Sequence, residues 1–215
     1  MNQLVTPKPT TLTDRLRVMF KWFLDPVGRF LNRIGLTPNT MTLLGLAGTT
    51  LGAYFLARGH MLWGGLLVLI MVPIDALDGT MARLRGEASA FGAFVDSVSD
   101  RYSELIILGG LMYYFLSVND HVGAILSFAA AAGSVLVSYI KARAESLGYT
   151  AKIGILTRVE RYLVLAPSLL FNQPFIGVAL IAILANFTAL QRIWYVRAQA
   201  HGRVSEKKKS MEKSL

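Results

Sequence analysis

Four aspartates lie close together in an otherwise apolar part of the sequence. Asp75 and Asp78 are three residues apart, and Asp96 and Asp100 are four apart. On a helix, both spacings place the two side chains on one face. Four carboxylates that converge at low dielectric constant need a cation if they are to stay ionised. Because this segment offers only oxygen ligands, with no His or Cys, the sequence predicts a site for Mg²⁺, Mn²⁺ or Ca²⁺.

The residues between the aspartates favour a phosphate ligand. Gly79 directly follows the second aspartate and Gly92 precedes the third by one turn, so that a ligand or backbone can approach closely. Arg83 lies four residues after Gly79, on the face where it can bind a phosphate. The alternative is that the acids form buried salt bridges with Arg83, Arg85 and Arg101. That alternative would suit one acid, but four acids at helical spacing favour a metal site.

The composition is that of a membrane protein. Of the 215 residues, 53% are hydrophobic and 16% are charged, whereas soluble domains carry about 25% charged residues. With no cysteine in the chain, disulfides and thiolate metal sites are excluded. The first ten residues contain no apolar segment of a secretory signal, so none is expected. Since a span needs roughly 20 apolar residues, six spans are predicted at 39–57, 62–82, 91–116, 122–140, 153–171 and 174–195.

The basic residues predict the orientation of these spans. On one side of the membrane, Arg58 is the only Arg or Lys. The other side would collect both terminal segments and the residues Arg83, Arg85, Lys141, Arg143, Lys152, Arg158 and Arg161. By the positive-inside rule, this side and both termini are cytoplasmic, in a cell membrane. The net charge of +9 is then explained by these flanks and by anionic lipid, so membrane lipids and not nucleic acid are the expected partners.

Three regions are predicted along the chain. Residues 1–35 form a cytoplasmic segment in which Leu12 to Ile34 alternate basic and apolar residues at near-helical spacing, as in a helix lying along a membrane surface. Pro26 should kink or divide that helix, and a simple anchoring linker is the alternative. Residues 36–198 form the six-helix domain, and 199–215 a basic cytoplasmic tail that is predicted to be disordered from His201 to Leu215. The fold class is therefore an all-α integral membrane protein, with six transmembrane helices preceded by an N-terminal amphipathic surface helix.

The aspartates belong to a longer motif that resembles that of a known family. Eight residues over 26 positions make up the pattern Asp75-x2-Asp78-Gly79-x2-Ala82-Arg83-x8-Gly92-x3-Asp96-x3-Asp100. This pattern is similar, at every fixed position, to the defining motif of the CDP-alcohol phosphatidyltransferases. The resemblance implies a homodimeric six-helix enzyme whose site opens to the cytoplasm. In that reaction an alcohol displaces CMP from a CDP-linked lipid such as CDP-diacylglycerol.

The resemblance also implies roles for individual residues. Asp75, Asp78 and Asp96 would hold a pair of divalent ions, Mg²⁺ or else Mn²⁺. Asp100 would bind one of these ions and act as the general base on the acceptor hydroxyl. The CDP group would be bound by residues of the motif and of a turn at the start of the first span: Asn39, Thr42, Gly79, Arg83 and Ser89. An Asn after a Pro, as at position 39, is also an ordinary helix N-cap.

The basic residues of the fourth and fifth spans predict the acceptor. Ser138, Lys141 and Arg143 lie near the end of the fourth span, and Arg158 and Arg161 share a face of the next helix. Converging cations suit an acceptor that carries its own phosphate, although positive-inside anchoring would also explain them. The stretches SYIKARAE and RVER are similar to those of actinobacterial phosphatidylinositol-phosphate synthases, which implies myo-inositol 1-phosphate as acceptor. Glycerol 3-phosphate as acceptor, or an ether-lipid donor, stays an alternative.

Two other classes of function compete with the transferase. A cation transporter could use the same acids, but these lie toward one membrane face beside Arg83, and repeated broken helices are not evident. A scaffold that binds acidic lipid would explain the basic charge but leaves the aspartates unexplained. The sequence therefore favours a phosphatidyltransferase.

Overall fold

The computed structural model describes residues 12–87, 89–151 and 153–212, and the regular structure within them is entirely α-helical. The predicted all-α fold class is thereby confirmed. In chain order the helices of this described part are α1 (Leu12–Arg33), α2 (Pro38–Ala57), α3 (Met61–Arg85), α4 (Ala90–Ser117), α5 (His121–Ser146), α6 (Arg158–Leu170) and α7 (Pro174–Glu212).

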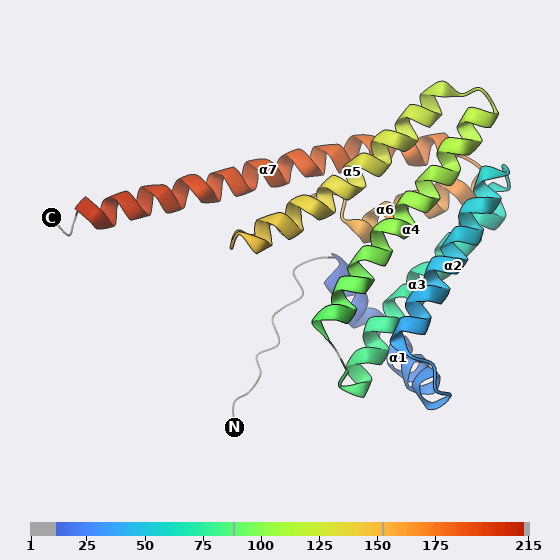
Figure 1. Ribbon diagram of the computed structural model, residues 1–215. Helices are drawn as coiled ribbons and strands as arrows, with labels where there is room; N and C mark the ends of the chain where they lie inside the picture. Colours follow the sequence, from blue (N-terminus) through green and yellow to red (C-terminus); the bar gives the residue numbers. More distant parts are fainter. Residues whose placement is uncertain (1–11, 88, 152, 213–215) are drawn as a thin grey trace.

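Two groups of helices are joined by α4 and α6. Helix α2 packs against α3 and α4, and α1 lies against α3. On the other side, α5 packs against α4 and α7. Helix α6 touches both α3 and α7, and Figure 1 shows α4 and α6 between the α2–α3 pair and the α5–α7 pair. Residues on α4 and α6 can therefore meet residues on α3 in the middle of the molecule.

The described residues include four helices that are long and apolar enough to cross a membrane: α2, α3, α5 and α7. Helix α4 has 28 residues, more than the roughly 20 required, but it carries Asp96, Asp100, Arg101 and Glu104. Helix α6 has only 13 residues. It begins at Arg158 and not at residue 153, so that the predicted start of the fifth span is wrong. The chain is a multi-pass membrane protein, and the number of six spans stays a prediction.

Small residues allow the site helices to approach closely. A Cβ added at Gly110 of α4 would lie 2.6 Å from the carbonyl oxygen of Ala53 in α2. On the other side, a Cβ at Gly133 of α5 would lie 2.6 Å from the Asn186 side chain of α7. Small residues at such crossings are the usual means of tight helix packing in membranes. They set α4 firmly against α2 and α5 against α7.

The two terminal helices differ in part from the prediction. Helix α1 forms as expected, and Pro26 lies inside it without dividing it. It buries Leu24 and leaves Phe20, Trp22 and Phe30 exposed, while its position along a membrane surface stays a prediction. The disorder predicted from His201 is wrong as far as Glu212, because α7 continues to that residue. Residues 1–11, Lys152 and 213–215 of the predicted regions lie outside the described residues.

The residues predicted to bind the CDP group lie near capped helix ends. Thr37 caps α2, its hydroxyl oxygen accepting a hydrogen bond from the Thr40 amide at 3.2 Å. Helix α3 ends at Gly86, whose φ of 71° lies in the left-handed region that favours glycine. Ser89 then caps α4 through the Gly92 amide at 3.0 Å. The short α3–α4 turn therefore keeps both aspartate pairs near one end of the molecule.

Candidate active site

Three of the four aspartates form a cluster that could hold a metal ion. Asp75 and Asp78 of α3 and Asp96 of α4 each offer a carboxylate oxygen, and these oxygens lie within 4.8 Å of one another. Asp78 is 5% exposed. Hard divalent cations prefer such a set of carboxylate oxygens, so the donor set fits the predicted metal. The helical spacing used for the prediction does bring residues of both helices to one place.

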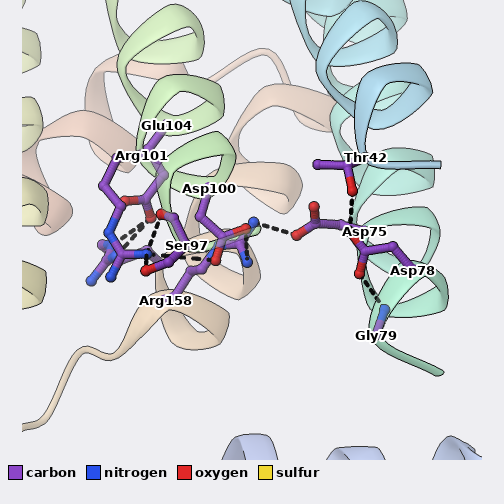
Figure 2. Close-up of polar contacts among 10 residues, drawn as sticks. Thr42, Asp75, Asp78, Gly79, Ser97, Asp100, Arg101, Glu104 and Arg158 are labelled. Atoms are coloured by element: carbon purple, nitrogen blue, oxygen red, sulfur yellow. Dashed lines mark hydrogen bonds and ion pairs between the residues drawn. The ribbon is translucent and has the colours of Figure 1, made fainter. Parts of the chain in front are cut away.

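Asp78 is held in position by two donors. The Thr42 hydroxyl of α2 donates to Asp78 Oδ2 at 2.7 Å, and the Gly79 amide donates to Asp78 Oδ1. Figure 2 shows both contacts on one side of the site. Hydrogen bonds of this kind orient a carboxylate toward its ion. Thr42, predicted to contact the CDP group, is only 6% exposed and donates its hydrogen bond to a predicted metal ligand.

Arg158 of α6 joins the two sides of the site. Its Nη2 lies 2.5 Å from Asp75 Oδ2, and its Nη1 lies 2.5 Å from Asp100 Oδ1. The guanidinium also lies over the Tyr162 ring, 5.6 Å from its centroid. In Figure 2, Arg158 stands between Asp100 of α4 and Asp75 of α3. A residue predicted to bind the acceptor phosphate therefore lies against two of the predicted metal ligands.

Two arginines of the salt-bridge alternative, Arg101 and Arg85, make their short contacts to groups other than the aspartates. Arg101 lies 3.9 Å from Asp100 Oδ2, and it donates to the Ser97 hydroxyl at 2.7 Å. Arg85 donates instead to Asn32 Oδ1 at 2.7 Å and to the Leu36 carbonyl at 2.6 Å. Arg85 thereby fixes the turn before α2. Arg158 of α6, 58 positions after Asp100 in the sequence, lies closer to that carboxylate, with its Nη1 2.5 Å from Asp100 Oδ1.

A buried ion pair links α4 to α6 one turn beyond Asp100. Arg161 Nε and Nη2 donate to Glu104 Oε1 at 2.9 and 2.7 Å, and Arg161 Nη1 donates to the Leu156 carbonyl at 3.3 Å. Arg161 is 3% and Glu104 is 7% exposed. Arg161, predicted to bind the acceptor phosphate, is thus engaged by Glu104. Glu104 was missed, although its position four residues after Asp100 would have placed it on the same face of α4.

Breaking this pair is expected to destabilise the protein strongly. Glu104→Gln would leave the Arg161 guanidinium buried without its counter-charge, which typically lowers the free energy of unfolding by about 3–5 kcal/mol. Glu87→Gln is the matched control, because Glu87 is 61% exposed and lies 3.8 Å from Arg85; exposed pairs contribute about 0–1 kcal/mol. Thermal and denaturant unfolding in detergent micelles measures both. Equal effects of the two substitutions would contradict a structural role for Glu104.

The remaining predicted CDP contacts surround the same end of the molecule. Asn39 is exposed in the first turn of α2. Arg83 is exposed in the last turn of α3 and donates to the Thr80 hydroxyl at 2.9 Å. Ser89 is exposed and caps α4. The Thr42–Asp78 bond places the start of α2, which carries Asn39, next to the end of α3; a contact of these three residues with the CDP group stays a prediction.

The other predicted acceptor residues lie on α5. Ser138 is half-buried, and Lys141 and Arg143 are exposed near the end of that helix. Arg158 is the predicted acceptor residue for which the structure gives direct contacts to aspartates of the site. By these contacts α6, more than the end of α5, is linked to the predicted metal ligands.

Comparison with known proteins gives a consistent result. The profile of the CDP-alcohol phosphatidyltransferase family matches residues 35–197. The archaetidylinositol phosphate synthase of Pyrococcus horikoshii is 36% identical over 85% of this chain and 95% of its own. The phosphatidylinositol phosphate synthase of Mycobacterium marinum is 35% identical over 84% of this chain and 82% of its own.

A similar fold is found among solved structures. A crystal structure of the Mycobacterium tuberculosis phosphatidylinositol phosphate synthase with CDP-DAG bound has a TM-score of 0.76 and 31% identity, covering 81% of this chain and 94% of that one. A second structure of that synthase holds manganese and citrate and has a TM-score of 0.77. The matched range and the identities leave one assignment: the chain belongs to the CDP-alcohol phosphatidyltransferase family and is an enzyme of that family.

Proposed function

We propose that this enzyme transfers the phosphatidyl group of CDP-diacylglycerol to myo-inositol 1-phosphate and releases CMP. The observation that carries the proposal is the position of Arg158, which lies between the carboxylates of Asp75 and Asp100. It places a cation suited to an acceptor phosphate beside the carboxylates suited to a divalent metal. The names of the relatives at 35–36% identity support inositol phosphate as the acceptor.

In the proposed reaction, Asp100 removes the proton of the acceptor hydroxyl. The freed oxygen attacks the lipid-bearing phosphorus, the bond from that phosphorus to the CMP oxygen breaks, and CMP leaves. A pair of Mg²⁺ ions held by Asp75, Asp78, Asp96 and Asp100 would neutralise the charge of the diphosphate. Because an aspartate is a weak base, its position matters more than its basicity. Arg158 fixes that position through its contact with Asp100 Oδ1.

Two groups of residues would bind the substrates. On the donor side, Asn39, Gly79, Arg83 and Ser89 surround the CDP group, while Thr42 orients Asp78. On the acceptor side, the phosphate is bound by Arg158 with Ser138, Lys141 and Arg143. We assign Arg161 an indirect part through its pair with Glu104.

For the membrane, we propose six spans in a cell membrane with both termini cytoplasmic: the helices α2, α3, α4, α5 and α7, and a fifth span in which residues 153–157 add to the 13 residues of α6. Helix α4 would span because its acids line the site and do not face lipid, which is how charged residues are tolerated in membranes. Helix α1 would lie along the cytoplasmic surface with its exposed aromatic residues in the lipid headgroups. We also propose a homodimer, in line with the family resemblance.

The acceptor can be identified by CMP release. Purified protein in micelles with CDP-diacylglycerol and Mg²⁺ is offered myo-inositol 1-phosphate, glycerol 3-phosphate or unphosphorylated myo-inositol in turn. A charge-assisted contact contributes about 1.5–3 kcal/mol, so kcat/KM should be roughly 10- to 100-fold higher with inositol phosphate than with inositol. A higher kcat/KM with glycerol 3-phosphate would identify that compound, the alternative, as the acceptor. Equal rates of CMP release with myo-inositol 1-phosphate and with unphosphorylated myo-inositol would contradict the role of Arg158.

The donor has a second candidate. The identity of 36% with an archaetidylinositol phosphate synthase is as high as that with the phosphatidylinositol phosphate synthases described above, so an ether-linked CDP-lipid is a specific alternative. The same assay with the two donors at equal surface concentration compares them. We expect the higher kcat/KM with the diacyl donor, and the reverse order would assign the ether lipid.

A further inference from the structure

The turn between α1 and α2 is held against the end of α3 by Arg85. Arg85 Nη2 donates to the Leu36 carbonyl at 2.6 Å, and Arg85 Nε donates to Asn32 Oδ1 at 2.7 Å. Asn32 Nδ2 in turn donates to the Met81 carbonyl of α3 at 3.3 Å. We call these three hydrogen bonds the turn clamp. The turn clamp joins the last turn of α1, the α1–α2 turn and the end of α3.

The backbone of the α1–α2 turn has a defined conformation. Gly35 has a φ of 86°, in the left-handed region that favours glycine. The Gly35 amide donates to the Asn32 carbonyl and the Leu36 amide to the Leu31 carbonyl, both at 3.2 Å. This pair of bonds is a common way for a helix to end at a glycine. Because Leu36 directly precedes Thr37, the cap of α2, the turn clamp holds the chain where α2 begins.

The turn clamp lies near the predicted metal ligand Asp78. Arg85 follows Asp78 by seven residues, which is about two turns of an α-helix, so both lie on the same face of α3. On the facing segment, Thr42 follows Leu36 by six residues. Thr42 donates to Asp78 and Leu36 accepts from Arg85, so the beginning of α2 is bonded to α3 at two points. The first bond orients the carboxylate, and the second holds the segment that carries the Thr42 hydroxyl.

Helices α1, α2 and α3 also share an apolar cluster beside these bonds. Its buried members are one residue of α1, one of α2 and two of α3: Leu24, Met41, Leu77 and Met81. Met41 directly precedes Thr42, and Leu77 directly precedes Asp78. The packing of α1 therefore reaches the residues next to the Thr42–Asp78 bond.

Arg85 is placed differently from Arg83, which lies two residues earlier on the same helix. Arg83 is exposed, whereas the Arg85 side chain is 23% exposed and donates to Asn32 and Leu36. A planar guanidinium can donate to two acceptors in fixed directions, and the ammonium of a lysine lacks that geometry. The contacts of Arg85 thus depend on its shape as well as on its charge.

We propose that Arg85 and Asn32 are positioning residues for the metal site. They hold the start of α2 so that the Thr42 hydroxyl stays in place to orient Asp78. The inference rests on the metal site of the proposed function, because Asp78 is assigned to the metal pair there. It adds that metal affinity depends on α1, a helix that supplies none of the predicted ligands.

Titration with Mn²⁺, followed by electron paramagnetic resonance, tests the turn clamp on the full-length enzyme without substrate. Arg85→Lys keeps the charge but loses the fork, and should weaken Mn²⁺ binding by about 2- to 10-fold, as expected for the loss of one hydrogen bond. Asn32→Ala removes the acceptor of Arg85 Nε and should have a similar effect. Both effects should be smaller than that of Thr42→Val, which removes the bond to Asp78 itself.

A double-mutant cycle determines whether the turn clamp acts through Thr42. In Thr42→Val the hydroxyl that orients Asp78 is gone, so adding Arg85→Lys should cause no further loss of Mn²⁺ affinity. A general loosening of the fold would instead lower the affinity by the same factor with and without the Thr42 hydroxyl. Such additivity would overturn the positioning role.

Matched controls exist for two of these substitutions. Arg29→Lys makes the same change as Arg85→Lys, but Arg29 is exposed and donates to the Asp25 carbonyl of its own helix, at 3.3 Å. Thr50→Val is the control for Thr42→Val, because both hydroxyls donate to the carbonyl four residues earlier and Thr50 is exposed on α2. Both controls should bind Mn²⁺ like wild type. Equal losses in Arg29→Lys and Arg85→Lys would overturn the turn clamp.

The remaining outcomes separate the turn clamp from the proposed function. Wild-type Mn²⁺ affinity in both Arg85→Lys and Asn32→Ala would overturn the positioning role and leave the transferase standing. The expected losses of affinity, in an enzyme that releases no CMP with any acceptor, would refute the transfer reaction and support the turn clamp. Wild-type protein that binds no Mn²⁺ would refute the metal site and, with it, the positioning role.

Discussion

Asp100→Asn is expected to lower the rate of CMP release by about 100- to 10,000-fold, the usual contribution of a general base. The substitution keeps the shape of the side chain, but the amide cannot accept the proton of the acceptor hydroxyl. With metal and both substrates saturating, the loss should appear in kcat, because Asp100 acts on the reacting proton. Steady-state CMP release with saturating CDP-diacylglycerol and inositol phosphate measures it.

The control for this substitution is Asp120→Asn at the distal end of the molecule. Asp120 precedes α5 and accepts a hydrogen bond from the Gly123 amide at 2.8 Å, a contact that an asparagine oxygen can keep. It should behave like wild type in rate and stability. If Asp100→Asn retained more than about a tenth of the wild-type kcat, Asp100 would not be the base.

Asp78→Asn is expected to remove metal-dependent activity and to weaken Mn²⁺ binding by more than about 100-fold, since even a residue that only orients a ligand contributes roughly 10- to 100-fold. Thr42→Val should weaken Mn²⁺ binding by the smaller factor, roughly 10- to 100-fold. This substitution removes the 2.7 Å hydrogen bond to Asp78 but leaves the carboxylate in place. Titration with Mn²⁺ followed by electron paramagnetic resonance gives both affinities without any substrate.

The stability of the metal-free protein distinguishes an aspartate that binds metal from one that stabilises the fold. Asp75, Asp78 and Asp96 repel one another when no cation is bound, so Asp78→Asn should leave the metal-free protein as stable as wild type or more so. Thr50→Val serves as the control for Thr42→Val and should keep wild-type affinity. Unchanged Mn²⁺ affinity in Asp78→Asn, or strong destabilisation without metal, would refute the cluster as the metal site.

The parts of the site that the sequence could predict are those governed by local geometry. Spacings of three and four along single helices placed Asp75 with Asp78, and the short basic turn placed Asp96 near them. The same rule, applied one turn further along α4, would have found Glu104. The apolar runs located the starts of α2, α3, α4, α5 and α7 to within a few residues, because a segment that crosses lipid must satisfy its own backbone as a helix.

The parts that could not be predicted depend on contacts between distant segments. Before α6, side chains of α7 form hydrogen bonds with Thr150, Ile153 and Leu156, and no local pattern indicates them. The pairing of Arg158 with Asp75 and Asp100 has the same origin. The tail was misjudged for another reason: Lys, Glu, Arg and Met are good helix formers, so α7 can continue where its apolar face has ended.

Transfer of labelled inositol phosphate into lipid tests the central claim most directly. Purified protein is reconstituted with CDP-diacylglycerol, and ³²P-labelled myo-inositol 1-phosphate is added with Mg²⁺ or with a chelator. We predict that label enters the lipid phase mole for mole with released CMP, only when the metal is present. Label that stays in the aqueous phase while CMP is released, or label that enters lipid equally with the chelator, would contradict the account.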